Sequence, residues 1–271
     1  MPRASKPERP SLLHSVASGC YGSSGSLKSR CCTTSHTILG IRTYSPVTSA
    51  VESFRRVIFA AVLIGSVAGV IVTLLHQSLT VPLILHAESF ETLHVHGTSP
   101  ETVWHPHSLR ERRVATAISD VLTGIGFALV LMAVWQFRDE RPDWRQGLAW
   151  GVGGFLAMTV APSLGLPAEL PGTAVAALRE RQLWWIATAA LTAVGLAVAC
   201  FARPWWLRIL ALASLALPHL VGAPQPLDAA SVVPRELLQA FQQSVLLCSF
   251  LFWVVLGVGA SYCYRALKAP A

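Results

Sequence analysis

The sequence has few charged residues for its length. Asp, Glu, Lys and Arg make up 13% of the 271 residues, whereas hydrophobic residues make up 53% and the mean hydropathy is +0.51. A typical globular protein has about 25% charged residues. A chain of 29.1 kDa cannot bury so much apolar surface in a core of its own, so a lipid bilayer must cover part of it. The composition therefore excludes a soluble protein and a wholly disordered one.

Several motifs that define other classes of protein are absent from the sequence. There is no GxxxxGK[ST] loop for an ATP-driven pump, and neither HExxH nor GxSxG for an intramembrane protease. The deep parts of the apolar runs hold no histidine, which argues against a diheme electron carrier. The six cysteines form no CxxC pair and are interpreted as small hydrophobic residues. Because these motifs are absent, we predict that the protein is not an enzyme. No basic stripe with interleaved aromatics accompanies the net charge of +7, so we do not predict a nucleic-acid-binding protein either.

Apolar runs recur along the rest of the chain. The first run is 19 residues long, enough at about 1.5 Å per residue to cross a hydrocarbon core of roughly 30 Å. The pattern predicts an all-α, polytopic membrane protein with about six transmembrane helices. Five is the alternative, if the fifth run, which contains Arg208 and Pro218, is re-entrant or interfacial. The six runs are Val57–Leu75, Val114–Phe137, Gly147–Ala161, Gln182–Ala202, Trp205–Val221 and Val245–Tyr264.

The distribution of Lys and Arg predicts the orientation of these runs. The shorter inner loops of a six-span topology hold more basic residues than the longer outer loops, so we expect both termini in the cytoplasm and the protein in the cell inner membrane. The segment "RERR" at Arg110–Arg113 is a contrary signal, because it lies on the side predicted to be outer.

Residues 1–50 differ in composition from everything that follows. They are rich in Ser, Gly, Thr and Pro and have no apolar run, so they are predicted to be a disordered tail and not a secretory signal. Val51 opens "VESFRRVIFAAVL", which is typical of the start of a bacterial membrane protein. We therefore predict that residues 1–50 reflect a misassigned start and that residues 51–271 form the transmembrane domain.

The seven histidines beyond residue 50 lie on the predicted outer side, six of them in a first outer loop at about 76–113. Two pairs have the form His-x-His, and Gly97, Pro100 and Pro106 favour an extended chain that turns both rings of a pair to one side. Imidazole and carboxylate groups suit divalent cobalt, nickel, zinc or copper. The alternative is a solvated polar loop with no metal role. The candidate ligands in this loop are His76, His86, Glu88, Glu91, His94, His96, His105 and His107.

Three further residues are candidates outside this loop. Asp120 lies about six residues inside the second run, where an acidic residue is costly and usually functional. It is predicted to be an ion relay or ligand, and the alternative is an interfacial acid paired with a nearby arginine. His219 lies at the outer end of the fifth run, where a helix-end role is the alternative. Glu169 is the only charge in "PSLGLPAELPG" (Pro162–Gly172), a connection rich in Pro and Gly.

Five segments of the sequence resemble the CbtA-type predicted cobalt transporter subunits: "DWRQGLAWGVGGF", "APSLGLPAELPG", "RQLWW", "LPHLVGAP" and "VPRELLQAF", in this order. The loop segment "LILHAESFE", with the histidines after it, is similar to that family too, and the resemblance covers about residues 54–265. It implies cobalt import tied to cobalamin synthesis, often with a small partner, CbtB, that has one membrane span and a histidine-bearing end. The resemblance also supports the loop histidines, Glu88, Glu91, Glu169 and His219 as metal ligands.

Together these features predict a transporter subunit that captures a divalent metal with outer histidines and passes it to His219 and Asp120. The metal is the cargo, cobalt first and nickel or zinc as alternatives, and no firmly bound cofactor is expected. The competing function is a metal-binding accessory or sensor membrane protein that does not transport.

Overall fold

A computed structural model describes residues 46–94, 108–226, 231 and 233–267. Apart from one isolated β-bridge between Thr173 and Ser231, the regular structure of these residues is helical, which confirms the all-α prediction. They belong to one contact unit, residues 44–271. The elements are α1 (Pro46–Leu75), η1 (His76–Thr80), α2 (Val81–His94), α3 (Leu109–Phe137), α4 (Trp144–Phe155), η2 (Leu156–Val160), α5 (Ala161–Ser163), α6 (Leu178–Phe201), α7 (Trp205–Ser214), α8 (Leu217–Val221) and α9 (Arg235–Leu267).

Four helical segments of the described chain are long and apolar enough to cross a membrane. They contain the first, second and sixth of the predicted runs and all but the last residue of the fourth, so four of the predicted runs are confirmed as candidate spans. The third predicted run falls in α4, η2 and α5, and the fifth falls in the shorter apolar stretch Trp205–Val221. The count of six therefore stays a prediction. The four segments are Val51–Phe90, Leu109–Phe137, Leu178–Phe201 and Arg235–Leu267.

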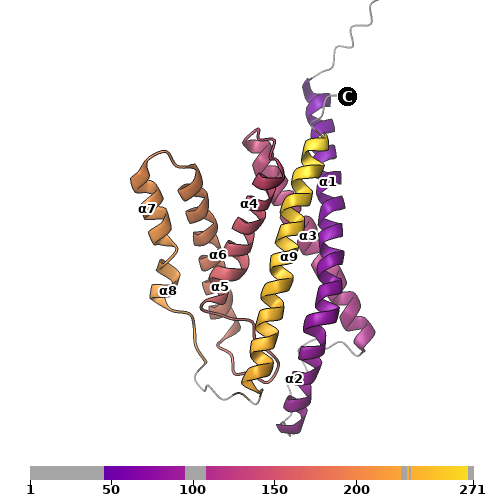
Figure 1. Cartoon of the computed structure of the whole chain (residues 1–271), viewed down its shortest axis with the longest axis vertical. Coiled ribbons are helices and arrows are strands. Elements are labelled where there is room, and N and C mark those ends of the chain that lie inside the picture. Colours follow the sequence, from indigo (N-terminus) through magenta and orange to yellow (C-terminus); the bar gives the residue numbers. More distant parts are fainter. Residues whose placement is uncertain (1–45, 95–107, 227–230, 232, 268–271) are drawn as a thin grey trace, which may run out of the picture. The chain divides into compact units, whose positions relative to one another are not determined.

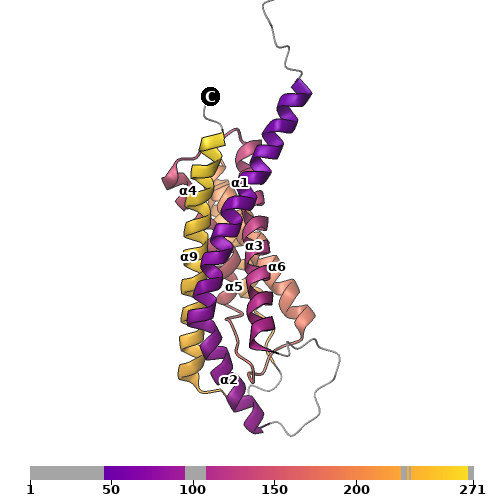
Figure 2. The same cartoon turned by 90° about the vertical axis from the view of Figure 1, so that its right-hand side faces the viewer.

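The long helices run back and forth between two ends of the bundle. The start of α1 and the end of α9 lie at one end, together with the turns that lead into α4 and α7 (Figures 1 and 2). We call this the terminal end. The opposite end holds α2 and the beginnings of α3, α6 and α9, and we call it the histidine end because His86 lies there on α2. Both described chain ends thus share one side, as the predicted topology requires.

Glycine residues let α1 pack unusually close to α3. Gly65 and Gly69 lie four residues apart on α1, and both face the backbone of α3. A Cβ atom added to Gly124 of α3 would overlap the carbonyl oxygen of Gly65. Small residues at this spacing allow membrane helices to approach until their backbones touch. The close contact holds the second half of α1 against the middle of α3, near Asp120.

The same spacing joins α4 to α9. Gly147 and Gly151 of α4 face the backbone of Gly257 and Trp253 on α9. The α4 helix begins at a capping box, in which the Asp143 side chain accepts from the Gln146 backbone and the Gln146 side chain accepts from the Asp143 backbone. The beginning of the third predicted run is thus held against α9 by backbone contact.

Two of the helical segments contain a π-helical turn shortly before a proline. In η1 the Val81 N–H donates to the carbonyl of His76, and Pro82 follows. In η2 the Ala161 N–H donates to the carbonyl of Leu156, and Pro162 follows. Proline lacks a donor and collides with the carbonyl four residues earlier, and a wider turn relieves that collision. The helix therefore continues beyond His76.

This continuation changes the predicted outer loop. Residues 76–94, which were expected to be its first part, are helical instead, because the wide turn of η1 accommodates Pro82. Residues 95–107 lie outside the described residues, as do residues 1–45 of the predicted tail. The last five residues of that tail, 46–50, form the beginning of α1.

Candidate ion-binding site

A cavity of about 370 Å³ lies between the spanning helices. Its walls come from α1, η1, α3, η2, α6 and α9, so both π-helical turns border it. The aromatic part of the lining consists of Phe127, Trp185, Phe252 and Trp253. The polar part consists of His76, Asp120, Thr123, Thr159 and Ser249.

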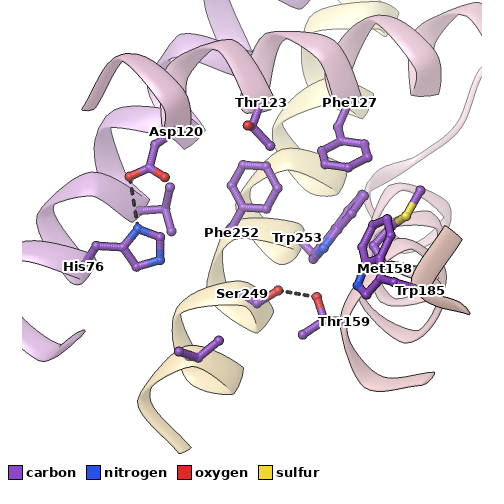
Figure 3. A pocket seen from close by; sticks show the side chains of 12 residues that line it. His76, Asp120, Thr123, Phe127, Met158, Thr159, Trp185, Ser249, Phe252 and Trp253 are labelled. Carbon is purple, nitrogen blue, oxygen red and sulfur yellow. Dashed lines mark hydrogen bonds and ion pairs between the residues drawn. The ribbon is translucent and has the colours of Figure 1, made fainter. Parts of the chain in front are cut away.

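His76 and Asp120 meet on one side of this cavity. The Nδ1 atom of His76 lies 3.0 Å from Oδ2 of Asp120, and the two side chains are 28% and 14% exposed (Figure 3). The Thr73 hydroxyl, one turn earlier on α1, lies 3.0 Å from the same Oδ2 atom and 2.9 Å from the carbonyl of Gly69. The close packing of Gly69 against α3 brings these groups together. Among the described residues, Asp120 is thus bonded to a histidine and a threonine and to no arginine, unlike in the alternative interpretation.

A second polar pair lies across the cavity. The hydroxyl groups of Thr159 in η2 and Ser249 in α9 are 2.6 Å apart. In Figure 3 this pair stands apart from the His76–Asp120 pair, and the rings of Phe252 and Trp253 lie above it. Sequence analysis missed both hydroxyl residues, because Ser and Thr are unremarkable inside apolar helices. The nearby Pro162 was the only local signal, since a proline within an apolar run indicates a disturbed helix.

Aromatic rings close the cavity on the side away from Asp120. Phe127 lies seven residues further along α3, a rise of roughly 10 Å. Its ring centroid is 4.7 Å from that of Trp253 and 6.4 Å from that of Phe252. Because α3 runs from the histidine end to the terminal end, the polar groups of α3 face the histidine end and this ring cluster lies deeper. Along α3, the cavity is therefore polar toward the histidine end and aromatic toward the terminal end.

Two predicted carboxylate ligands form ion pairs with arginine at the histidine end. Glu88 of α2 pairs with Arg112 of α3 at 2.5 Å, and Glu169 pairs with Arg181 of α6 at 2.6 Å. Each pair joins segments that are distant in sequence. The pairing also offsets the charge of Arg112 within "RERR", the segment that contradicted the charge rule.

The remaining predicted ligands do not line the cavity, as far as the structure describes them. His86 is exposed on α2 with its ring 5.3 Å from that of Phe90. His219 of α8 lies against Trp184 of α6, with the ring centroids 5.7 Å apart. Glu91 and His94 belong to the last turn of α2. The other three, His96, His105 and His107, lie outside the described residues.

The described chain thus brings together one imidazole and one carboxylate of the predicted set. Within the described ranges, no three His, Cys, Asp or Glu residues are grouped so that they could hold a metal ion. A single pair with hydroxyl neighbours and space for water is suited to weak, reversible binding of a cation. Tight structural metal sites, in contrast, are formed by three or four protein ligands.

Four apolar segments long enough to cross a membrane, together with this internal pair, define a multi-pass membrane protein with a polar site among its helices. Such intramembrane ionisable groups are typical of ion pathways. The family model described as "Probable cobalt transporter subunit (CbtA)" matches residues 54–265, and the chain belongs to this family. The resemblance drawn from the sequence segments is thereby confirmed. No curated protein and no solved structure matches the chain.

Membership of this family indicates a cobalt transporter subunit, which favours the prediction of a protein other than an enzyme. Because the family is described as a subunit, it also implies a further subunit of the transporter.

Proposed function

We propose that this chain carries a divalent transition-metal ion, cobalt above all, into the cell across the inner membrane, and that the imported cobalt serves cobalamin synthesis. Both termini lie in the cytoplasm in this proposal, so the histidine end faces outward. The observation that carries the proposal is the His76–Asp120 pair in a cavity between spanning helices, in a chain of the CbtA family.

The chemistry of the cavity supports passage of a cation. An imidazole replaces a water ligand of the ion, which lowers the cost of moving the ion out of bulk water. A site with few protein ligands releases the ion again, which conduction requires. A membrane potential that is negative inside favours inward movement by about 2.3 kcal/mol per charge per 100 mV, and by twice this for a divalent ion.

Capture at the histidine end precedes the cavity in this mechanism. We place capture on the outer histidines from His86 to His107, with the histidine-bearing end of a small CbtB-like partner as a further donor. Glu88 and Glu169 are bound to Arg112 and Arg181, so a metal must compete with a guanidinium for these carboxylates. His219 contacts Trp184 and does not line the cavity. In this mechanism it acts only at the edge of the bundle.

Uptake of radioactive cobalt by proteoliposomes tests the proposal. Liposomes that contain the purified chain, alone and with the single-span partner, are given an inside-negative potential. We expect cobalt to accumulate inside in a potential-dependent manner, with a higher rate when the partner is present. Binding of cobalt to the protein without accumulation in either preparation would overturn the proposal and favour the accessory or sensor function.

Cysteine labelling tests the orientation. In a variant whose six native cysteines are replaced by alanine, Val175→Cys and Arg141→Cys each introduce one exposed thiol, at the histidine end and the terminal end respectively. We expect a membrane-impermeant thiol reagent to label the cysteine at 175 in intact spheroplasts and the one at 141 only after lysis. The reverse pattern would mean that the histidine end faces the cytoplasm.

A further inference from the structure

We propose that His76 binds the transported ion through its Nε2 atom, and that Asp120 is a positioning residue that holds the His76 ring in the required tautomer. This inference rests on the proposed transport function and deepens it. It also differs from the sequence-based prediction, in which Asp120 itself is a relay or a ligand.

The hydrogen bond between the two side chains determines which ring nitrogen is free. An ionised carboxylate can only accept hydrogen bonds, so His76 donates through Nδ1 to Oδ2 of Asp120 at 3.0 Å. A neutral imidazole carries one N–H group, and the other nitrogen then has a lone pair. With the proton on Nδ1, the lone pair is on Nε2. Figure 3 shows this second nitrogen on the side of the ring away from Asp120, toward the cavity.

The surroundings of Asp120 fit a positioning role better than direct coordination. Its Oδ2 atom faces two donor groups, Nδ1 of His76 and the hydroxyl of Thr73. These donors come from η1 and α1, so the carboxylate ties the wide turn to α3. A histidine that binds a metal through one nitrogen commonly donates its other N–H to a carboxylate in this way, which fixes the ring and raises its basicity. Asp120 is such a carboxylate for His76, and the Thr73 hydroxyl is bonded to it in turn.

The size of the cavity indicates how the ion is held. At about 370 Å³, it has room for an ion together with several waters, since one water takes about 30 Å³ in the liquid. The described residues provide no group of three His, Cys, Asp or Glu ligands. Binding is then the exchange of one water of the hydrated ion for Nε2 of His76, and the proton on Nδ1 stays where it is. The substrate of this site is a largely hydrated divalent cation.

Two substitutions of Asp120 separate positioning from coordination. In Asp120→Asn the amide oxygen can take the place of Oδ2 and still accept from Nδ1 of His76, while the Thr73 hydroxyl can donate to this oxygen or to the carbonyl of Gly69. In Asp120→Ala no acceptor is left. We expect Asp120→Asn to retain cobalt uptake within about threefold of the wild type, and Asp120→Ala to lose about 10- to 100-fold, the usual effect of removing such a partner.

Equal losses in the two variants, at normal amounts of protein in the membrane, would show that the carboxylate itself coordinates or compensates the ion, and would overturn the inference. Absence of uptake by the wild-type protein would instead contradict the proposed function. The two failures are therefore distinguishable.

A spectroscopic measurement tests the tautomer without transport. Nitrogen NMR of the histidine-labelled, full-length protein in lipid nanodiscs reports which ring nitrogen carries the proton, and comparison with His76→Gln identifies the His76 signals. We expect protonated Nδ1 and unprotonated Nε2 in the wild type and in Asp120→Asn, and a mixture of tautomers in Asp120→Ala. A proton on Nε2 of the wild-type His76 ring, with or without a proton on Nδ1, would contradict the inference.

Discussion

Replacement of His76 by glutamine is expected to lower the maximal rate of cobalt uptake by about 10- to 100-fold. The glutamine amide can still donate a hydrogen bond to Asp120, so the link between η1 and α3 is preserved. What is lost is the nitrogen lone pair that takes the place of a water ligand inside the cavity. The loss therefore falls on movement through the bundle and not on capture at the surface.

His86→Gln is the matched control for this prediction. His86 lies ten residues later on α2, exposed beside Phe90 and away from the cavity lining. Its loss is expected to raise the half-saturating cobalt concentration at most a few fold and to leave the maximal rate unchanged, because other outer histidines share capture. Initial rates of cobalt uptake in proteoliposomes over a range of cobalt concentrations measure both quantities. A wild-type maximal rate for His76→Gln would mean that the ion does not pass this residue.

Substitution of Gly124 by alanine is expected to destabilise the bundle by about 1–3 kcal/mol, as overpacking of a close contact usually does. The new methyl group would overlap the carbonyl of Gly65, so α1 and α3 would have to separate. The same separation would move Thr73 and His76 away from Asp120, and we therefore expect uptake to fall as well.

Gly126→Ala on the same helix provides the control. A Cβ atom at Gly126 meets no atom within 4 Å, so alanine there is tolerated, and its higher helix propensity is worth roughly 0.5–1 kcal/mol. Thermal unfolding of the two purified variants in the same detergent compares them directly. If Gly124→Ala unfolds at the same temperature as Gly126→Ala, the backbones of α1 and α3 are not in contact at Gly124.

The fold could be predicted largely from the apolar runs, because membrane-spanning segments are defined by length and composition. The ends of the helices could not be predicted in this way, because an apolar run stops at the first charged residues whereas the helix continues through them. The α3 helix begins at Leu109, where the Ser108 hydroxyl accepts from the Glu111 N–H as an N-cap, and so it includes "RERR". A helix can extend beyond the bilayer, and capping residues rather than charge then determine where it starts.

The sequence predicted two residues of the candidate site but not the contact between them. His76 and Asp120 were each singled out from the sequence, but their contact depends on the register between α1 and α3, which the backbone contacts of Gly65 and Gly69 determine. Hydropathy contains no information about that register. For the same reason Thr73 was not recognised as the third member of the group.

Contacts between different parts of the chain also determine whether the other candidate ligands are available to a metal. Glu88 and Glu169 are 24 and 12 residues away from the arginines that bind them. His219 was expected at the opening of the ion path, but α8 packs on α6, so its ring lies against Trp184. Spacing in the sequence indicates which groups can bind a metal, whereas the packing of helices decides which of them meet.

The wide turn at η1 also determines the rotational phase of α2. A π-helical turn holds one residue more than the α-helical turn it replaces, and one residue corresponds to about 100° of rotation. Without the surplus residue, the side chains of α2 would be turned by more than a quarter of a revolution about the helix axis. Glu88 would then no longer face Arg112, although α1 would still span the membrane. One extra residue beside His76 thus orients the whole extension of the first helix at the histidine end.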